Sequence, residues 1–266
     1  MTPWSYDQIA HVYDHDMGLN ADPRSVAWYL HQLDRHARMG GRVLELGCGT
    51  GRVTLPVVEA GHPVVAVDRS PAMLNVLRRK ARLRRVLDRI HFVEGDMCAF
   101  ALEGTFEAVI CPFSVLAYIV DDASLTRLLA QVRKYIVPRG ILAFDMFVPG
   151  SMQQTGTWMH DYRRQLPQTE FGDRCILERS KRLERNVATG VTRIDRIYEL
   201  SDAHGRIVEE IETCSWQRER SPKDWGTLMR EAGFALLGAW ADFDMPWRPG
   251  MPIPPTIAYV FRPADT

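Results

Sequence analysis

Three glycines at alternate positions lie between a strand-like and a helix-like segment in the stretch GRVLELGCGTGRVTLPVVEAG. They are Gly47, Gly49 and Gly51. Glycine lets the backbone turn tightly and approach a ligand closely, and the start of a helix attracts nucleotide-like ligands. Asp68 ends a second strand-like run 21 residues after Gly47, where a carboxylate can accept hydrogen bonds from ribose hydroxyls. Loop and acid together predict a nucleotide-like ligand, and a tight turn without a ligand is the alternative.

An acid before the loop narrows the kind of nucleotide expected. The glycine spacing is GxGxG, whereas dinucleotide-binding loops carry GxGxxG. Glu45 stands two residues before the first glycine, where a carboxylate would be poorly placed near a pyrophosphate. An acid there favours a cationic or hydrogen-donating ligand, such as the amino-acid end of S-adenosylmethionine (SAM).

On these residues the chain resembles the class I SAM-dependent methyltransferases, because VLELGCGTG matches the first motif of that family. The resemblance covers residues 6 to about 148, and more loosely the last helix and strand pair. It implies SAM as the cofactor. Glu45, Gly47 and Gly49 would lie along its methionine part, and Asp68 would bind its ribose.

The resemblance also assigns an adenine subsite. Arg69 or Met73 would flank the adenine, and Asp96 in EGDM would accept from its amino group with Met97 alongside. A turn residue after a strand is the alternative for Asp96. The full set assigned to the cofactor is Tyr13, Glu45, Gly47, Cys48, Gly49, Asp68, Arg69, Met73, Asp96, Met97, Cys111 and Phe113.

The methyl acceptor is expected beyond the carboxyl ends of the strands, where open α/β sheets bind ligands. The run ICPFSVLAYI follows such a strand and offers Phe113 as an aromatic wall and Tyr118 as a polar contact, unless both are core residues. The N-terminal YDQIAHVYDHDM resembles the opening of glycine and amino-sugar N-methyltransferases, where Tyr13 would reach the methyl region; an aromatic anchor of the terminus is the alternative. With His160 from the later part of the chain, Tyr118 and Tyr13 are the candidate catalytic residues.

The candidate residues can form one site only if the fold brings the ends of several strands together. Strand-like runs at 42–46, 63–68, 90–94, 106–111 and 141–148 alternate with helix-like segments. Such alternation predicts right-handed βαβ units and a parallel sheet. The family resemblance implies an α/β, Rossmann-like, seven-stranded sheet that is mostly parallel, with the last strand antiparallel.

The chain changes character after Pro149. Period-two segments at 175–185, 191–200 and 206–218, separated by turn signals, predict an antiparallel meander. We expect residues 1–150 and 219–266 to form the SAM-binding domain, with 1–22 as an N-terminal lid segment and 151–218 as an inserted β subdomain. In this family such insertions roof the substrate pocket or build a homodimer interface. The arginines of this region would meet an anionic substrate or form a solvated sheet face, and the solvated face is favoured: Arg163, Arg164, Arg179, Arg193 and Arg196.

The composition of the 266 residues argues against several classes of binding partner. Lys plus Arg and Asp plus Glu are 33 each, which argues against electrostatic capture of nucleic acid. The basic run at 78–89 has no interleaved aromatic residue and is interpreted as a solvated helix face. Five scattered cysteines without a CxxC pair predict no disulfide framework and no metal site, in a reducing cytoplasm. No secretion signal and no membrane-spanning run are predicted.

The sequence therefore predicts methyl transfer from SAM to a small-molecule acceptor. CPF at 111–113 lacks the amide or acid and the second proline of nucleic-acid amino methyltransferases. No histidine–acid pair stands out as a general base, which favours an amine nitrogen over an oxygen acceptor. The alternatives are an O-methyltransferase of a small metabolite, an RNA or protein methyltransferase, and a SAM-binding protein without catalysis.

Overall fold

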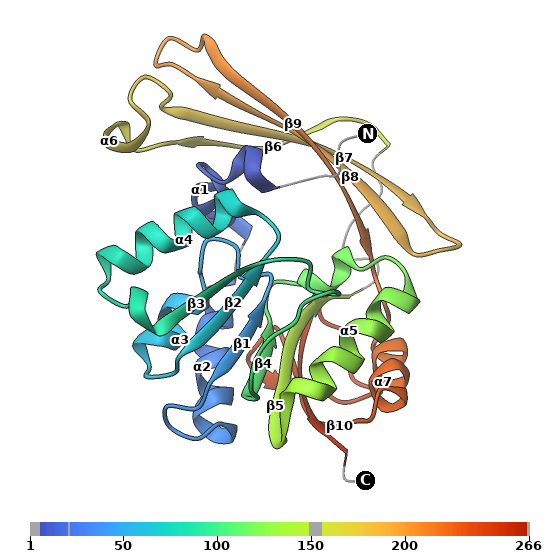
Figure 1. Cartoon of the computed structure of the whole chain (residues 1–266). Helices are drawn as coiled ribbons and strands as arrows, with labels where there is room; N and C mark the ends of the chain where they lie inside the picture. The colour runs from blue at the N-terminus through green and yellow to red at the C-terminus, as the bar shows by residue number, and fades with distance from the viewer. Residues whose placement is uncertain (1–5, 21, 149–155, 265–266) are drawn as a thin grey trace.

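The computed structural model of the chain describes residues 6–20, 22–148 and 156–264. Figure 1 shows a helix-flanked sheet below a second sheet that crosses its upper end. The lower, eight-stranded sheet has the order β11-β10-β12-β5-β4-β1-β2-β3. Its strands are β1 (Val43–Leu46), β2 (Val64–Asp68), β3 (Ile90–Glu94), β4 (Phe106–Cys111), β5 (Ile136–Phe147), β10 (Phe234–Ala241), β11 (Met245–Pro246) and β12 (Thr256–Pro263).

The predicted α/β sheet is confirmed. Strands β1 to β5 pair in parallel, and the last strand, β12, runs antiparallel to both β5 and β10. The two-residue β11 adds an edge strand to the seven expected. Parallel pairing brings the carboxyl ends of β1, β2, β3 and β4 to the same edge, which is where a ligand site of this fold class forms.

Helices cover both faces of this sheet (Figure 1). They are α2 (Arg24–His36), α3 (Thr54–Glu59), α4 (Pro71–Leu83), the short η2 (Leu87–Arg89), α5 (Asp122–Tyr135) and α7 (Pro222–Glu231). Buried side chains of α5 and α7 form one core with the sheet, and those of α2, α3 and α4 form the other. Two of these helices begin at Ser-Pro pairs: Ser70 accepts from the Met73 amide at the start of α4, and Ser221 forms a reciprocal capping box with Asp224 at the start of α7.

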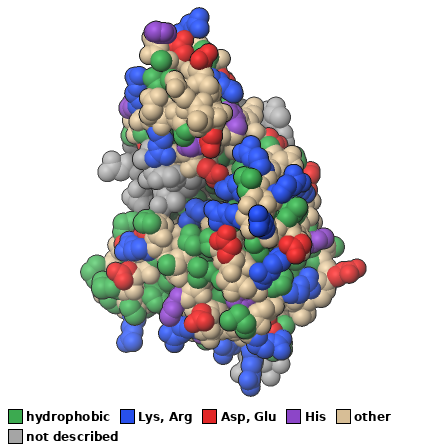
Figure 2. Space-filling model, turned by 90° about the vertical axis from the view of Figure 1, so that its left-hand side faces the viewer, with side chains coloured by type: hydrophobic (Ala, Val, Ile, Leu, Met, Phe, Trp, Pro, Cys, Tyr) green, Lys and Arg blue, Asp and Glu red, His purple; other side chains and the backbone are tan. Residues whose placement is uncertain are grey.

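The basic segment at 78–89 lies largely on the exposed side of α4 and the turn after it. Figure 2 shows this side of the molecule, where Lys and Arg side chains are interspersed with acidic ones. Lys80 pairs with Asp14 at 2.9 Å, and Arg84 pairs with Glu59 at 3.2 Å. Part of this positive charge is therefore neutralised within the protein.

The predicted antiparallel meander forms the upper sheet, in the order β6-β7-β8-β9. Its strands are β6 (Met159–Gln165), β7 (Ile176–Asn186), β8 (Val191–Ser201) and β9 (Ile207–Arg218), with α6 (Gln168–Phe171) between β6 and β7. Strand β6 was not predicted, because MHDYRRQ is an edge strand with little apolar alternation.

The N-terminal elements are η1 (Tyr6–Ile9) and α1 (Tyr13–Asn20). Ile9 and Val12 pack against Leu177 and Tyr198 of the upper sheet, in a third hydrophobic cluster. The start of the chain thus fills the space between the two sheets. The longest described helix, α5, has 14 residues, so no described helix is long enough to cross a bilayer.

Candidate active site

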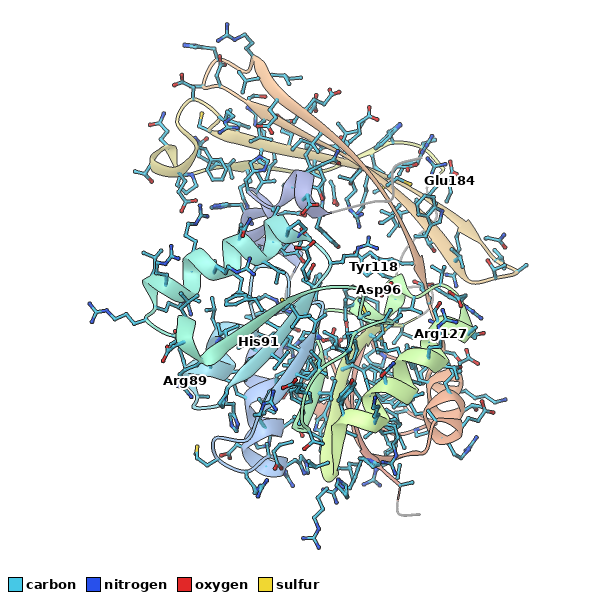
Figure 3. The ribbon with its side chains drawn as sticks, viewed as in Figure 1. Arg89, His91, Asp96, Tyr118, Arg127 and Glu184 are labelled. Carbon is cyan, nitrogen blue, oxygen red and sulfur yellow. The ribbon has the colours of Figure 1, made fainter. Side chains whose placement is uncertain are left out.

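A cavity of about 330 Å³ lies at the carboxyl ends of β1, β2, β3 and β4, beneath η1 and α1. Figure 3 shows Tyr118 and Asp96, which both line it, in the region between the two sheets. Ten of the residues predicted for the site line this cavity. They are Tyr13, Gly47, Gly49, Asp68, Arg69, Met73, Asp96, Met97, Phe113 and Tyr118.

The glycine loop after β1 forms one wall. Gly47 has a φ of 70°, and a Cβ there would lie 2.3 Å from Val115 Cγ2, so only glycine fits. A Cβ at Gly51 would lie 2.1 Å from Leu77 Cδ1. Gly51 also has a positive φ of 86°, and α3 starts only at Thr54. The loop thereby keeps its backbone close to the cavity.

Asp68 joins this loop to the next strand end. One carboxylate oxygen accepts from the Gly49 amide at 2.8 Å, and the other accepts from the Ser70 amide at 2.9 Å. Burial raises the pKa of Asp68, and the two backbone donors counteract that rise. Since each oxygen has a second lone pair, the carboxylate can still accept from two ligand hydroxyls.

The adenine-side candidates lie along the same cavity. Met73 is almost fully buried, and Arg69, Asp96 and Met97 complete this part of the lining. One oxygen of Asp96 accepts from the Cys98 amide at 2.8 Å, as in a turn. The turn interpretation of Asp96 and its place in the cavity are therefore compatible.

Aromatic side chains close the end of the cavity toward the upper sheet. The hydroxyls of Tyr6 and Tyr118 are hydrogen-bonded to each other, and the Tyr6 and Tyr13 rings meet edge to face at 5.4 Å. Burial raises the pKa of both Tyr6 and Tyr13 well above that of an exposed phenol. Both phenols are therefore neutral near pH 7, and they offer hydrogen bonds rather than negative charge.

Four predicted residues are not part of the described lining. Glu45 is buried and accepts from the Thr54 hydroxyl at 2.7 Å, and burial raises its pKa to about 8. Cys48 and Cys111 are buried in the cores on the two faces of the lower sheet. His160 is exposed on β6.

One residue that shapes the site, Asp145, was not predicted from the sequence. Asp145, near the end of β5, is 2% exposed and accepts from the Tyr29 hydroxyl at 2.6 Å and from the amides of Phe113 and Ser114 at 2.8 and 3.1 Å. Those two residues have φ values of 59° and 52°, a conformation that is strained for residues other than glycine. Asp145 thus holds the turn that carries Phe113. The feature of the sequence that could have indicated Asp145 is its position as an acidic residue inside the apolar run ILAFDMF.

Known proteins resemble the chain both in sequence and in structure. Residues 43–140 match the family model described as a methyltransferase domain. The chain is 31% identical over 154 residues to the cypemycin N-terminal methyltransferase of Streptomyces sp, an alignment that spans 57% of each chain.

Two solved structures share the fold over almost the whole chain. The CcbJ methyltransferase from Streptomyces caelestis has a TM-score of 0.81 at 22% identity and covers 97% of both chains. The sugar N-methyltransferase KedS8 from Streptoalloteichus sp ATCC 53650 has a TM-score of 0.73 at 23% identity, over 96% of this chain and 93% of that one. The matched family model identifies residues 43–140 as a methyltransferase domain, and the chain has the class I fold of SAM-dependent methyltransferases.

Proposed function

We propose that the protein transfers the methyl group of SAM to an amine nitrogen of a small-molecule acceptor. The observation that carries this proposal is the lining of the cavity at its upper end. Phe113, Tyr118, Tyr6 and Tyr13 surround it, and no described lining residue is a histidine. An amine needs only a free lone pair, whereas an oxygen acceptor generally needs a base to remove its proton.

The residues present fit SAM. A cavity of about 330 Å³ lies within the usual range of roughly 300–1,000 Å³ for small-molecule sites. Asp68 keeps two acceptor positions for the vicinal hydroxyls of a ribose, and Asp96 keeps acceptor capacity for an adenine amino group. In this arrangement Gly47 and Gly49 would face the methionine part.

The chain's contribution to the reaction is alignment and exclusion of water. When bound, SAM supplies an electrophilic methyl group, and the amine lone pair forms the new N–C bond while the C–S electron pair stays on the neutral thioether. Positive charge moves from sulfur to nitrogen, so a dry aromatic site does not oppose the step as it would oppose charge separation. Phe113 and the tyrosines would hold the two reactants in line. The ammonium product releases its extra proton to water.

We further propose that the described parts of the predicted N-terminal lid segment and β insertion, residues 6–20 and 156–218, act together as the lid of this site; residues 1–5, 21 and 151–155 of those predicted ranges lie outside the described residues. Tyr6 on η1 and Tyr13 on α1 line the cavity, while Ile9 and Val12 of the same segment pack on the upper sheet. The cypemycin enzyme is named an N-terminal methyltransferase and KedS8 a sugar N-methyltransferase, which supports an amine acceptor. A small molecule suits a cavity that is closed in this way.

Calorimetry with S-adenosylhomocysteine tests the cofactor site. Asp68→Asn removes half of the carboxylate's acceptor capacity, and we expect at least tenfold weaker binding. Asp88→Asn, an exposed aspartate on η2, is the matched control and should bind normally. Equal affinity in both variants would refute the assignment of Asp68.

Transfer of a radiolabelled methyl group tests the acceptor atom. We expect label on primary or secondary amines and none on the corresponding alcohols. Transfer to the alcohols with the amines inert would replace the amine proposal by O-methylation. Binding of the cofactor without transfer to any member of a broad metabolite panel would favour a non-catalytic SAM-binding protein.

A further inference from the structure

Arg196 of the upper sheet has a neutral hydrogen-bond partner but no carboxylate partner among the described residues. Of the other four arginines considered above, three pair with carboxylates and one donates to a backbone carbonyl. Arg163 pairs with Glu178, Arg179 with Asp16 and Asp161, and Arg193 with Asp195, while Arg164 donates to the His15 carbonyl. Arg196 donates to Ser215 Oγ at 3.2 Å, but no carboxylate of a described residue lies within 4.0 Å of it. The favoured interpretation of these arginines as a solvated sheet face therefore does not hold for Arg179, which is buried with its carboxylate partners, or for the partly buried Arg196.

Arg196 faces the interior of the molecule. It stands two residues before Tyr198 on β8 and so shares the face that packs on the N-terminal segment. Its side chain is partly buried and interacts electrostatically with Tyr6 and Tyr118, which line the cavity. Strand β9, beside β8, packs against η3 (Val115–Tyr118), the element that carries Tyr118. Arg196 is not among the lining residues, but it thus lies near the Tyr6–Tyr118 pair at the upper end of the cavity.

Two hydroxyls accompany this cation. Thr213 is directly opposite Arg196 on β9, is 6% exposed, and its Oγ1 has no hydrogen-bond partner among the described residues. Ser215 is 1% exposed, and because its oxygen accepts from Arg196, its proton remains available for donation. A partly buried cation without a counterion and a buried hydroxyl without a hydrogen-bond partner are both costly. An anion between Arg196 and Thr213 would give the guanidinium a counterion and the hydroxyl a hydrogen-bond acceptor.

We propose that Arg196, with Ser215 and Thr213, binds a carboxylate of the methyl acceptor, so that the acceptor is an amine that also carries a carboxylate. This inference rests on the proposed function for the identity of the bound molecule as the acceptor. One guanidinium without a carboxylate partner among the described residues offsets one negative charge, and its planar fork matches the two oxygens of a carboxylate. A phosphate dianion would carry one negative charge more than this guanidinium offsets.

A binding measurement tests the site without requiring catalysis. With saturating S-adenosylhomocysteine, acetate should raise the midpoint of thermal unfolding of the wild type. The shift should be lost in Arg196→Gln, reduced in Arg196→Lys and retained in Arg163→Gln, whose arginine is exposed and paired with Glu178. Normal affinity of Arg196→Gln for S-adenosylhomocysteine would show that the variant is folded. The same acetate shift in all variants, or a larger shift with inorganic phosphate, would overturn the carboxylate site.

A transfer assay then separates this inference from the proposed function. Matched pairs of amino acids and their amides are offered with radiolabelled SAM. We expect label on the acids only, with KM for them raised at least tenfold in Arg196→Gln and unchanged in Arg163→Gln. If wild type methylates amides as well as acids, the carboxylate site fails while methyl transfer to amines stands. If acetate protects through Arg196 but no amine is labelled, the carboxylate site stands and the proposed function fails.

Discussion

Asp145 fixes the cavity wall that carries Phe113, because one buried carboxylate satisfies a phenol and two backbone amides at once. Its pKa is raised by burial, and the hydroxyl of Tyr29 and the two amides work against that rise. The other side of the turn is supported by Arg52, whose guanidinium lies 5.3 Å from the centre of the Phe113 ring. Strained backbone of this kind persists only where its surroundings hold it.

Tyr29→Phe tests this arrangement by removing one donor and leaving the ring. We expect the free energy of unfolding to fall by about 1.5–3 kcal/mol, the usual contribution of a hydrogen bond to a charged group. Urea unfolding measures it. Tyr259→Phe is the control, since that buried tyrosine donates to no described residue. Equal losses in the two variants would show that Asp145 gains nothing from Tyr29.

Glu45 gives a pH dependence that can be measured directly. Burial raises its pKa from 4.5 to about 8 in the folded protein, so the folded state holds a proton that the unfolded chain has released. The stabilisation is complete below pH 4.5 and is lost as the pH rises toward 8. Relative to Glu45→Gln, the ligand-free wild type should therefore lose a few kcal/mol of stability between about pH 5 and pH 8, at about 1.4 kcal/mol per pKa unit.

Urea unfolding of both proteins at several pH values checks this expectation. Glu103→Gln, an exposed glutamate, serves as the control and should follow the wild-type curve. A constant difference in stability between wild type and Glu45→Gln across this range would contradict a neutral Glu45.

Local sequence patterns predicted the cofactor side of the cavity better than the acceptor side. Gly47 directly follows β1, Asp68 ends β2 and Asp96 stands two residues after β3, so locating the strands located these residues. Asp145 and Arg196 act through partners far away in the chain, Tyr29 and Tyr118, and no spacing reveals such pairs. Whether the residues lining the cavity bind SAM as the resemblance implies stays a prediction that the Asp68 experiment tests.

Among the secondary-structure elements, those with strong caps or apolar periodicity were predictable. The helices behind Ser70-Pro71 and Ser221-Pro222 begin where the capping residues indicate. Strand β6 and helix α6 were not, because their residues are mostly polar and take their structure from β7 and from the N-terminal segment. Tertiary packing decided these elements, as it often does at sheet edges.

The docking of α1 on the upper sheet depends on Asp16. This buried carboxylate accepts from Tyr162 at 2.7 Å, from Tyr198 at 3.1 Å and from Arg179. In Asp16→Asn, Arg179 keeps only Asp161, so we expect a loss of about 2 kcal/mol, less than the roughly 3–5 kcal/mol for a fully uncompensated buried charge. Because Tyr13 sits on the same helix, affinity for S-adenosylhomocysteine should fall as well.

Hydrogen exchange of the amides in residues 6–20 measures this docking. Faster exchange there, with unchanged exchange in α5, is the expected result. Asp34→Asn, on the exposed side of α2, provides the control. Unaltered exchange in Asp16→Asn would mean that the apolar contacts of Ile9 and Val12 suffice to hold the segment.

The charge of the whole molecule bears on the alternative of an RNA substrate. The net charge is zero, and the basic side of α4 is interspersed with acidic groups (Figure 2). Binding to a phosphate backbone releases counterions, so a protein that uses it loses affinity steeply between roughly 50 and 200 mM salt. We expect filter binding to detect no specific RNA complex, and the rate of methyl transfer to a small amine to change less than twofold over that range of salt. The variant Arg79→Gln/Arg82→Gln, which removes two exposed basic groups of α4, should match wild type in both assays. Salt-sensitive RNA binding that this variant weakens would instead make α4 a nucleic-acid contact and favour the RNA methyltransferase alternative.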